Sequence, residues 1–87
     1  MKVKLFGNLR QKAGANELVA SGATIREALE SLCAANEPLH AAIFTGAELR
    51  PHVRVMVNGL DCELADGLET AVFPQDTIAI FTTIAGG

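Results

Sequence analysis

Residues 77–87 read TIAIFTTIAGG, and this stretch decides how the rest of the chain must be arranged. Ile78 and Ile80 fall on one face of an alternating pattern, which predicts a strand over residues 77–81. The stretch ends in Gly86-Gly87, a pair that chance places there in roughly one chain in 200 at a glycine frequency of about 7 %. A frayed terminus is the alternative, because chain ends are often poorly ordered. The strand favours a tail that leaves directly from a rigid edge.

Other segments also alternate as strands do. Residues 2–7 place Val3 and Leu5 on one face, and residues 53–57 alternate valines with Arg54 and Met56. The second of these strands stops at Asn58-Gly59, the strongest short-range hairpin signal. Shorter strands are expected at residues 17–20 and 60–63.

A helix is predicted after residue 24. Thr24 and Glu27 have the spacing of a capping box, in which each side chain bonds the backbone of the other end of the first turn. Apolar residues then recur at helical spacing, at Ile25, Ala28, Leu29, Leu32 and Cys33. We expect the helix to end near Asn36, just before Pro38.

The remaining segments predict short connections. Residues 38–44 are expected to form a helical turn that directs Leu39, Ile43 and Phe44 inward. Residues 45–48 are expected to form a loop, and residues 66–68 a turn.

The predicted order is strand, strand, helix, short turn, strand, short strand, strand. One helix must cover one face of a mixed sheet to close a single core. We therefore expect the α+β class and the β-grasp (ubiquitin-like) fold, with about four to five strands and one main helix on one face. The β-grasp domain is expected over residues 1–81, followed by a flexible tail over residues 82–87.

Composition narrows the possible functions. The chain has 87 residues, 49 % of them hydrophobic, which fits one folded domain and excludes disorder. No apolar run approaches the ~20 residues that span a membrane, and residues 1–6 resemble a first strand rather than a signal peptide. A net charge of −3 disfavours nucleic-acid binding. We expect a cytoplasmic protein with neither a nucleic-acid nor a membrane partner.

Two cysteines and two histidines are candidate reactive residues. Cys33 continues the apolar stripe of the helix, as a small buried hydrophobe would. Cys33 and Cys62 are distant in sequence, and a disulfide is not expected in a cytosolic chain. Together with His40 and His52 they lack the paired spacing of zinc ligands. We expect no metal site and no catalytic role for these four residues.

Three stretches resemble the sulfur-carrier branch of the ubiquitin-like proteins, particularly the small subunit of molybdopterin synthase and its archaeal and bacterial relatives. They are KLFGNLR at residues 4–10, VMVNG at 55–59, and residues 76–87. Thr82-Thr83 stands where that family commonly has two prolines, so this tail has more backbone freedom. The stretch from residue 38 to 52 is longer than in the thiamine-pathway carrier, which favours the molybdopterin-like or small-modifier branch.

The resemblance implies a carrier rather than an enzyme. An ATP-using partner would adenylate the Gly87 carboxylate, sulfur would displace AMP, and the thiocarboxylate would serve an acceptor such as a pterin precursor. Gly86 and Gly87 would form the reactive end, ATP would be used by the partner, and the chain would bind no cofactor of its own. Two alternatives stay open: a protein modifier joined through Gly87 to lysine amines, and a purely structural β-grasp module.

The resemblance also implies two partners, an adenylating enzyme and a synthase large subunit or other sulfur acceptor. If Leu5 and Ile80 are core residues, strand alternation turns Phe6, Met56 and Phe81 outward. The expected partner-binding residues are Phe6, Arg10, Met56, Phe81, Thr82, Thr83, Ile84 and Ala85. Ordinary surface scatter, or cover by residues 45–51, is the alternative for the aromatic pair.

The first sixteen residues hold only basic charge. Their four cations are Lys2, Lys4, Arg10 and Lys12. They are interpreted either as a solvated strand face and turn or as a basic rim that meets an acidic partner.

Overall fold

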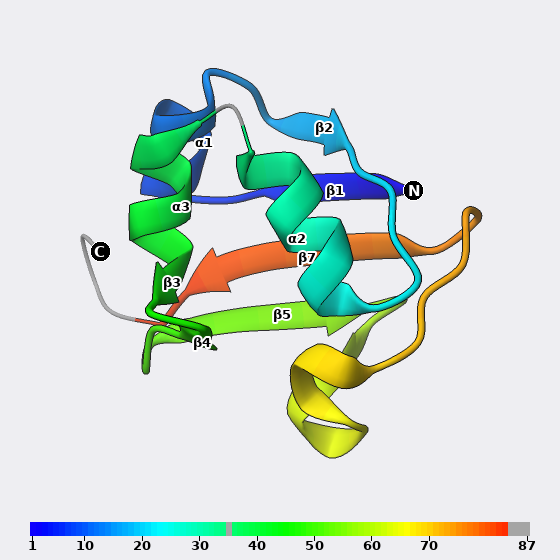
Figure 1. Ribbon diagram of the computed structural model, residues 1–87. Coiled ribbons are helices and arrows are strands. Elements are labelled where there is room, and N and C mark those ends of the chain that lie inside the picture. Colours follow the sequence, from blue (N-terminus) through cyan, green and yellow to red (C-terminus); the bar gives the residue numbers. More distant parts are fainter. Residues whose placement is uncertain (35, 84–87) are drawn as a thin grey trace.

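A five-stranded mixed sheet forms one layer of the protein, and helices cover one of its faces (Figure 1). The computed structural model describes residues 1–34 and 36–83. The strand order is β2-β1-β7-β5-β6. The strands span Lys2–Leu5 (β1), Glu17–Val19 (β2), Val53–Val57 (β5), Leu60–Asp61 (β6) and Thr77–Thr82 (β7). This is the α+β, β-grasp architecture that the sequence predicted.

The last strand, β7, lies at the centre of the sheet. It runs parallel to β1, with Leu5 opposite Ile80, and antiparallel to β5, with Val55 opposite Ile80. This register aligns the buried side chains of the three strands on the helix-covered face. Ile78 and Ile80 are fully buried there, as their alternation predicted.

The main helix, α2 (Ile25–Cys33), begins at the predicted cap. The Glu27 N–H donates to the Thr24 hydroxyl (N–O 3.2 Å), and the Glu27 carboxylate accepts from the Ala23 N–H (2.9 Å), one residue before the expected donor. Gly22 allows this approach, because a Cβ at its position would lie 2.7 Å from the Ala28 nitrogen. The helix ends three residues earlier than predicted.

Two shorter helices accompany the main helix α2. Helix α3 (Glu37–Ile43) lies beside α2 in front of the sheet (Figure 1) and buries Leu39 and Ile43 as expected. Helix α1 (Asn8–Ala13) was not predicted; it contacts α3 and buries Leu9. Because α1 has six residues and Leu9 is its one buried side chain, its sequence shows no helical repeat of apolar residues. Within the described ranges, no helix is long and apolar enough to cross a membrane.

The connections are more regular than the sequence suggested. Asn58 and Gly59 both have positive φ, 50° and 87°, as a tight hairpin turn requires. The expected loop at residues 45–48 is a hairpin of β3 (Phe44–Thr45) and β4 (Glu48–Leu49). The region around the expected turn at 66–68 holds two 3-10 helices, η1 (Cys62–Leu64) and η2 (Gly67–Glu69).

Both cysteines are buried and free. Burial raises the pKa of Cys33 to about 11 and also raises the pKa of Cys62. A thiolate, the reactive form, is therefore disfavoured at both positions at neutral pH. The two thiols belong to the core, as expected.

Truncating the core face should destabilise the protein. Leu29 is fully buried in α2, so Leu29→Ala should lower the free energy of unfolding by about 2–5 kcal/mol. Leu64→Ala is the matched control, because Leu64 is 76 % exposed. Denaturant unfolding measures both. Equal small losses would show that α2 does not present Leu29 to the core.

Burial should also protect the thiols. At pH 8 a thiol reagent should modify neither cysteine in the native protein and both in denaturant. Because their folded-state pKa values are raised, unfolding releases protons near pH 9, and stability should fall as the pH rises from about 9 toward 11. Denaturant midpoints of the parent and of Cys33→Ala across this range measure the effect. Rapid native labelling of either thiol would contradict its burial.

Candidate functional site

The root of the C-terminal tail is held firmly at one end of the sheet. Thr82 is the last residue of β7 and pairs with Val53 of β5. The Thr83 N–H donates to the His52 carbonyl (N–O 2.8 Å), and the Thr83 hydroxyl donates to the same oxygen at 3.3 Å. Regular structure thus extends one residue past the expected boundary at 81. The predicted Ile84, Ala85, Gly86 and Gly87 lie outside the described residues.

The uncovered face of the sheet carries an apolar patch. Phe6, Met56 and Phe81 come together around a shallow hollow of about 560 Å³. Phe6 is 46 % exposed, whereas Met56 and Phe81 are half-buried. The remaining lining residues are Lys4, Asn58, Gly59, Thr77 and Ala79. We use "apolar patch" for Phe6, Met56, Ala79 and Phe81.

Strand alternation correctly predicted that Phe6, Met56 and Phe81 turn away from the core. Residues 45–51 do not line the hollow, so this loop is not its cover. Arg10 is exposed on α1 and does not line it either. Ala79 and Thr77 were missed, although they have the same strand parity as Phe81.

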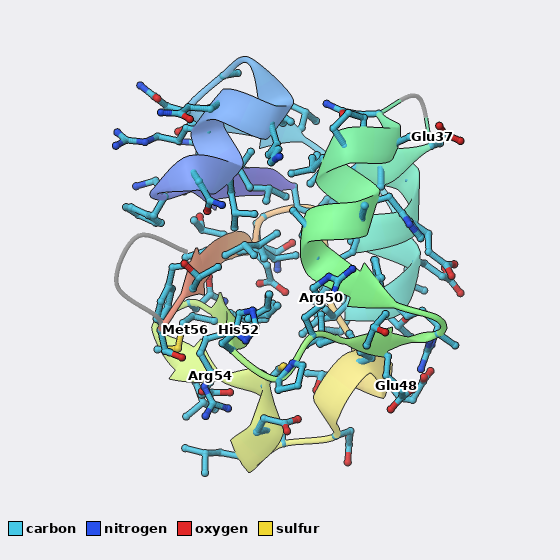
Figure 2. All side chains as sticks on the ribbon, turned by 90° about the vertical axis from the view of Figure 1, so that its left-hand side faces the viewer. Glu37, Glu48, Arg50, His52, Arg54 and Met56 are labelled. Atoms are coloured by element: carbon cyan, nitrogen blue, oxygen red, sulfur yellow. The ribbon has the colours of Figure 1, made fainter. Side chains whose placement is uncertain are left out.

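A second cavity, of about 380 Å³, lies beside the root of the tail. It opens between α1, α3, the segment before β5, and the end of β7. Lys12, Arg50 and His52 line it together with Thr82, and Figure 2 shows Arg50 and His52 lying near each other. We call this cavity the basic pocket. His52 was expected to have no role, and Arg50 was not singled out.

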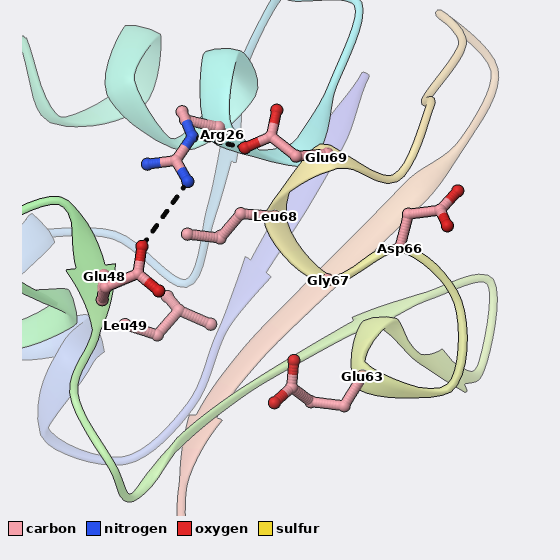
Figure 3. Close-up of a pocket in the computed structure, with 8 residues that line it drawn as sticks. All are labelled: Arg26, Glu48, Leu49, Glu63, Asp66, Gly67, Leu68 and Glu69. Carbon is pink, nitrogen blue, oxygen red and sulfur yellow. Dashed lines mark hydrogen bonds and ion pairs between the residues drawn. The ribbon is translucent and has the colours of Figure 1, made fainter.

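A third cavity, of about 330 Å³, is mostly acidic (Figure 3). Arg26 of α2 is the cation among the described residues that line it. Its Nε donates to a Glu69 oxygen (2.7 Å), and a terminal nitrogen donates to the Ala47 carbonyl (2.6 Å). Glu48 is also within ion-pair distance of the guanidinium, at 3.7 Å. The hydrogen bond to Glu69 raises the pKa of Arg26. These contacts fasten α2 to η2 and to the β3–β4 hairpin, which is a structural role.

The part of the chain that the structure describes offers no set of metal ligands. There, no group of three or more histidine, cysteine, aspartate or glutamate side chains could hold a metal ion. Among the described residues, the candidate functional regions are therefore the root of the tail, the apolar patch and the basic pocket.

Curated relatives match the chain end to end. The small archaeal modifier protein 3 of Haloferax volcanii is 30 % identical and is aligned over 100 % of this chain and 98 % of its own length. A putative sulfur carrier protein of Archaeoglobus fulgidus is 32 % identical with the same coverage.

Solved structures agree with these relatives. In the BexX/CysO complex of Amycolatopsis orientalis, the matched chain superposes with a TM-score of 0.89 at 29 % identity, covering 99 % of this chain and 98 % of that one. The small archaeal modifier protein 1 of Methanosarcina acetivorans gives 0.89 at 34 % identity, covering 99 % and 94 %. The ThiS family model matches residues 3–87. The chain therefore belongs to the ThiS family of ubiquitin-like sulfur carriers.

Proposed function

We propose that this protein carries sulfur as a thiocarboxylate on Gly87, and that it serves molybdopterin biosynthesis. The observation that supports this most directly is that residues 84–87 follow β7, the central strand of the sheet, in a chain 32 % identical to a putative sulfur carrier protein. The family match also extends to residue 87. The protein contributes a folded domain that its partners bind and a reactive carboxylate, while the partners contribute the catalytic groups.

The chemistry needs an activated end. A terminal carboxyl has a pKa of about 3.3–3.7, so it is ionised at neutral pH and is a poor electrophile. Its oxygen attacks the α-phosphorus of ATP on an activating enzyme, which releases pyrophosphate and leaves an acyl-adenylate. Hydrosulfide then attacks the carbonyl carbon and AMP departs, which leaves the thiocarboxylate. Glycines at 86 and 87 suit this path, because a narrow active site can admit backbone without side chains.

The hydrogen bonds at Thr82 and Thr83 fix the position from which the tail leaves the domain. The backbone of Thr82 and Thr83 is tied to β5 and to His52, so a partner that docks on the folded domain meets the tail at a constant position. The apolar patch offers the docking surface, since exposed apolar side chains that cluster mark interaction sites. Phe6 and Phe81 are the aromatic anchors that such an interface uses.

Protein modification is the second candidate function. Matched relatives are named modifier proteins, and one other relative is a ubiquitin-related modifier 1 homolog of Drosophila grimshawi, 33 % identical over 95 % of this chain. The same acyl-adenylate would serve, with a lysine amine of a target replacing sulfur as the nucleophile. Attachment of the chain to other proteins in cell extracts would favour this function.

The last glycine should be essential for activation and unimportant for folding. Deleting Gly87, or replacing it with leucine, should abolish ATP-dependent adenylation by the activating enzyme of the same organism, because the reacting carboxylate is displaced or obstructed. Gly87→Ala adds a single methyl group and should be affected less. Pyrophosphate exchange, intact mass after addition of ATP and hydrosulfide, and a thermal melt measure these effects. Full adenylation of the truncated chain would refute the carrier function.

Phe81 should matter to a partner more than to the fold. Phe81→Ala should change the melting temperature little, yet weaken binding to the activating enzyme or synthase large subunit by about 2 kcal/mol. Phe73→Ala is the matched control, because Phe73 is 56 % exposed and does not line the hollow. Calorimetry on the purified pair gives the affinities. Equal affinities for the two variants would remove the apolar patch from the interface.

A further inference from the structure

The basic pocket brings together two strong cations from distant parts of the sequence. Lys12 comes from the last turn of α1, and Arg50 from the segment between β4 and β5. Both line the same cavity, together with the half-buried His52. Its walls include the apolar side chains of Leu9, Pro38, Ala41 and Ala42. The pocket thus combines a positive rim with an apolar lining.

Neither cation is neutralised by a carboxylate of the described residues. Arg50 donates from Nε to the Ala41 carbonyl, which fixes the guanidinium and leaves its terminal nitrogens without a described protein partner. Lys12 has no ion pair within 4.0 Å among residues 1–34 and 36–83. In Figure 2, Glu37 and Glu48 lie to the side, away from His52. Arg26, by contrast, has two carboxylate partners.

The half-buried Asn8 adds a polar side chain to the pocket wall. The Oδ1 atom of Asn8, which lines the pocket, is buried and has no hydrogen-bond partner among the described residues. The same amide carries an N–H₂ group with two donors, and donors suit an anionic ligand. A carboxylate is the ligand that suits Lys12, Arg50 and these amide donors together. The apolar walls of the pocket suit the methylene groups of an aspartate or glutamate side chain, which carry the carboxylate.

The position of the pocket indicates where such a carboxylate comes from. Thr82 lines the pocket, and Thr83 bonds the backbone of His52, so the pocket borders the root of the tail. An enzyme that takes residues 84–87 into its active site must contact the surface around that root. We propose that the basic pocket receives an aspartate or glutamate side chain of the activating enzyme. This inference rests on the proposed function, and it adds a polar contact to the apolar patch.

Neutralising the pocket should weaken docking without touching the reacting end. We expect the variant carrying both Lys12→Gln and Arg50→Gln to bind the activating enzyme about tenfold more weakly at low salt. The affinity of the parent protein should fall as salt rises, and that of the variant should fall less, because the lost interaction is electrostatic. Lys2→Gln is the matched control, since Lys2 is exposed on β1 and lies outside the pocket.

Two measurements separate this proposal from the function on which it rests. Calorimetry without ATP gives the affinity, and pyrophosphate exchange gives KM and kcat. A raised KM with an unchanged kcat supports docking. If the parent protein is adenylated and the double variant binds equally well, the pocket proposal is wrong and the carrier function stands. If the double variant binds more weakly than the parent but the parent is never adenylated, the function fails and the pocket stands.

The same measurements identify a different occupant. If the double variant binds more tightly than the parent, the pocket holds the carboxylate of this chain's own terminus, and the proposal is overturned. Lys12→Gln alone serves if the double variant melts early, because the Arg50 contact with Ala41 supports the local fold. Lys12 is exposed, so its substitution is not expected to disturb folding.

Discussion

The pairing of β7 with β1 on one side and β5 on the other is the constraint on which the structure depends. Leu5, Val55 and Ile80 can share the core only in this register. The same pairing fixes the apolar patch, because Phe6 and Phe81 follow the core residues and must turn to the opposite face. It also ends β7 beside His52, where the tail begins. The core, the apolar patch and the root of the tail therefore follow from one arrangement of strands.

Most of the fold could be predicted from local patterns. The alternation in residues 53–57, the cap at Thr24 and the turn at Asn58-Gly59 each act over a few residues, so the sequence displays them directly. Helix α1 could not be predicted this way. Its six residues form a helix because Gly7, with a φ of 62°, turns the chain into α1 two residues after β1 ends, and because Leu9 is buried in the core. The second reason depends on tertiary packing.

The two candidate surfaces differ in the same respect. The apolar patch was predictable, because parity along β1, β5 and β7 places its aromatic residues. The basic pocket was not predictable, because Lys12, Arg50 and Thr82 are far apart in sequence and meet through the packing of α1 against α3 and the pairing of β5 with β7. A basic rim was one of two interpretations of the four early cations, and no pattern connected Lys12 with Arg50 or placed His52 beside them.

The central position of β7 has a consequence for how the protein is made. The ribosome synthesises the N-terminal strand first, yet β1 gains its parallel neighbour only after residues 77–82 have emerged. A nascent chain that stops early lacks both the tail and the middle of the sheet, so its apolar strands stay exposed to proteolysis. A chain that lacks β7 therefore loses the strand that joins β1 to β5, and with it the residues that lead into the tail.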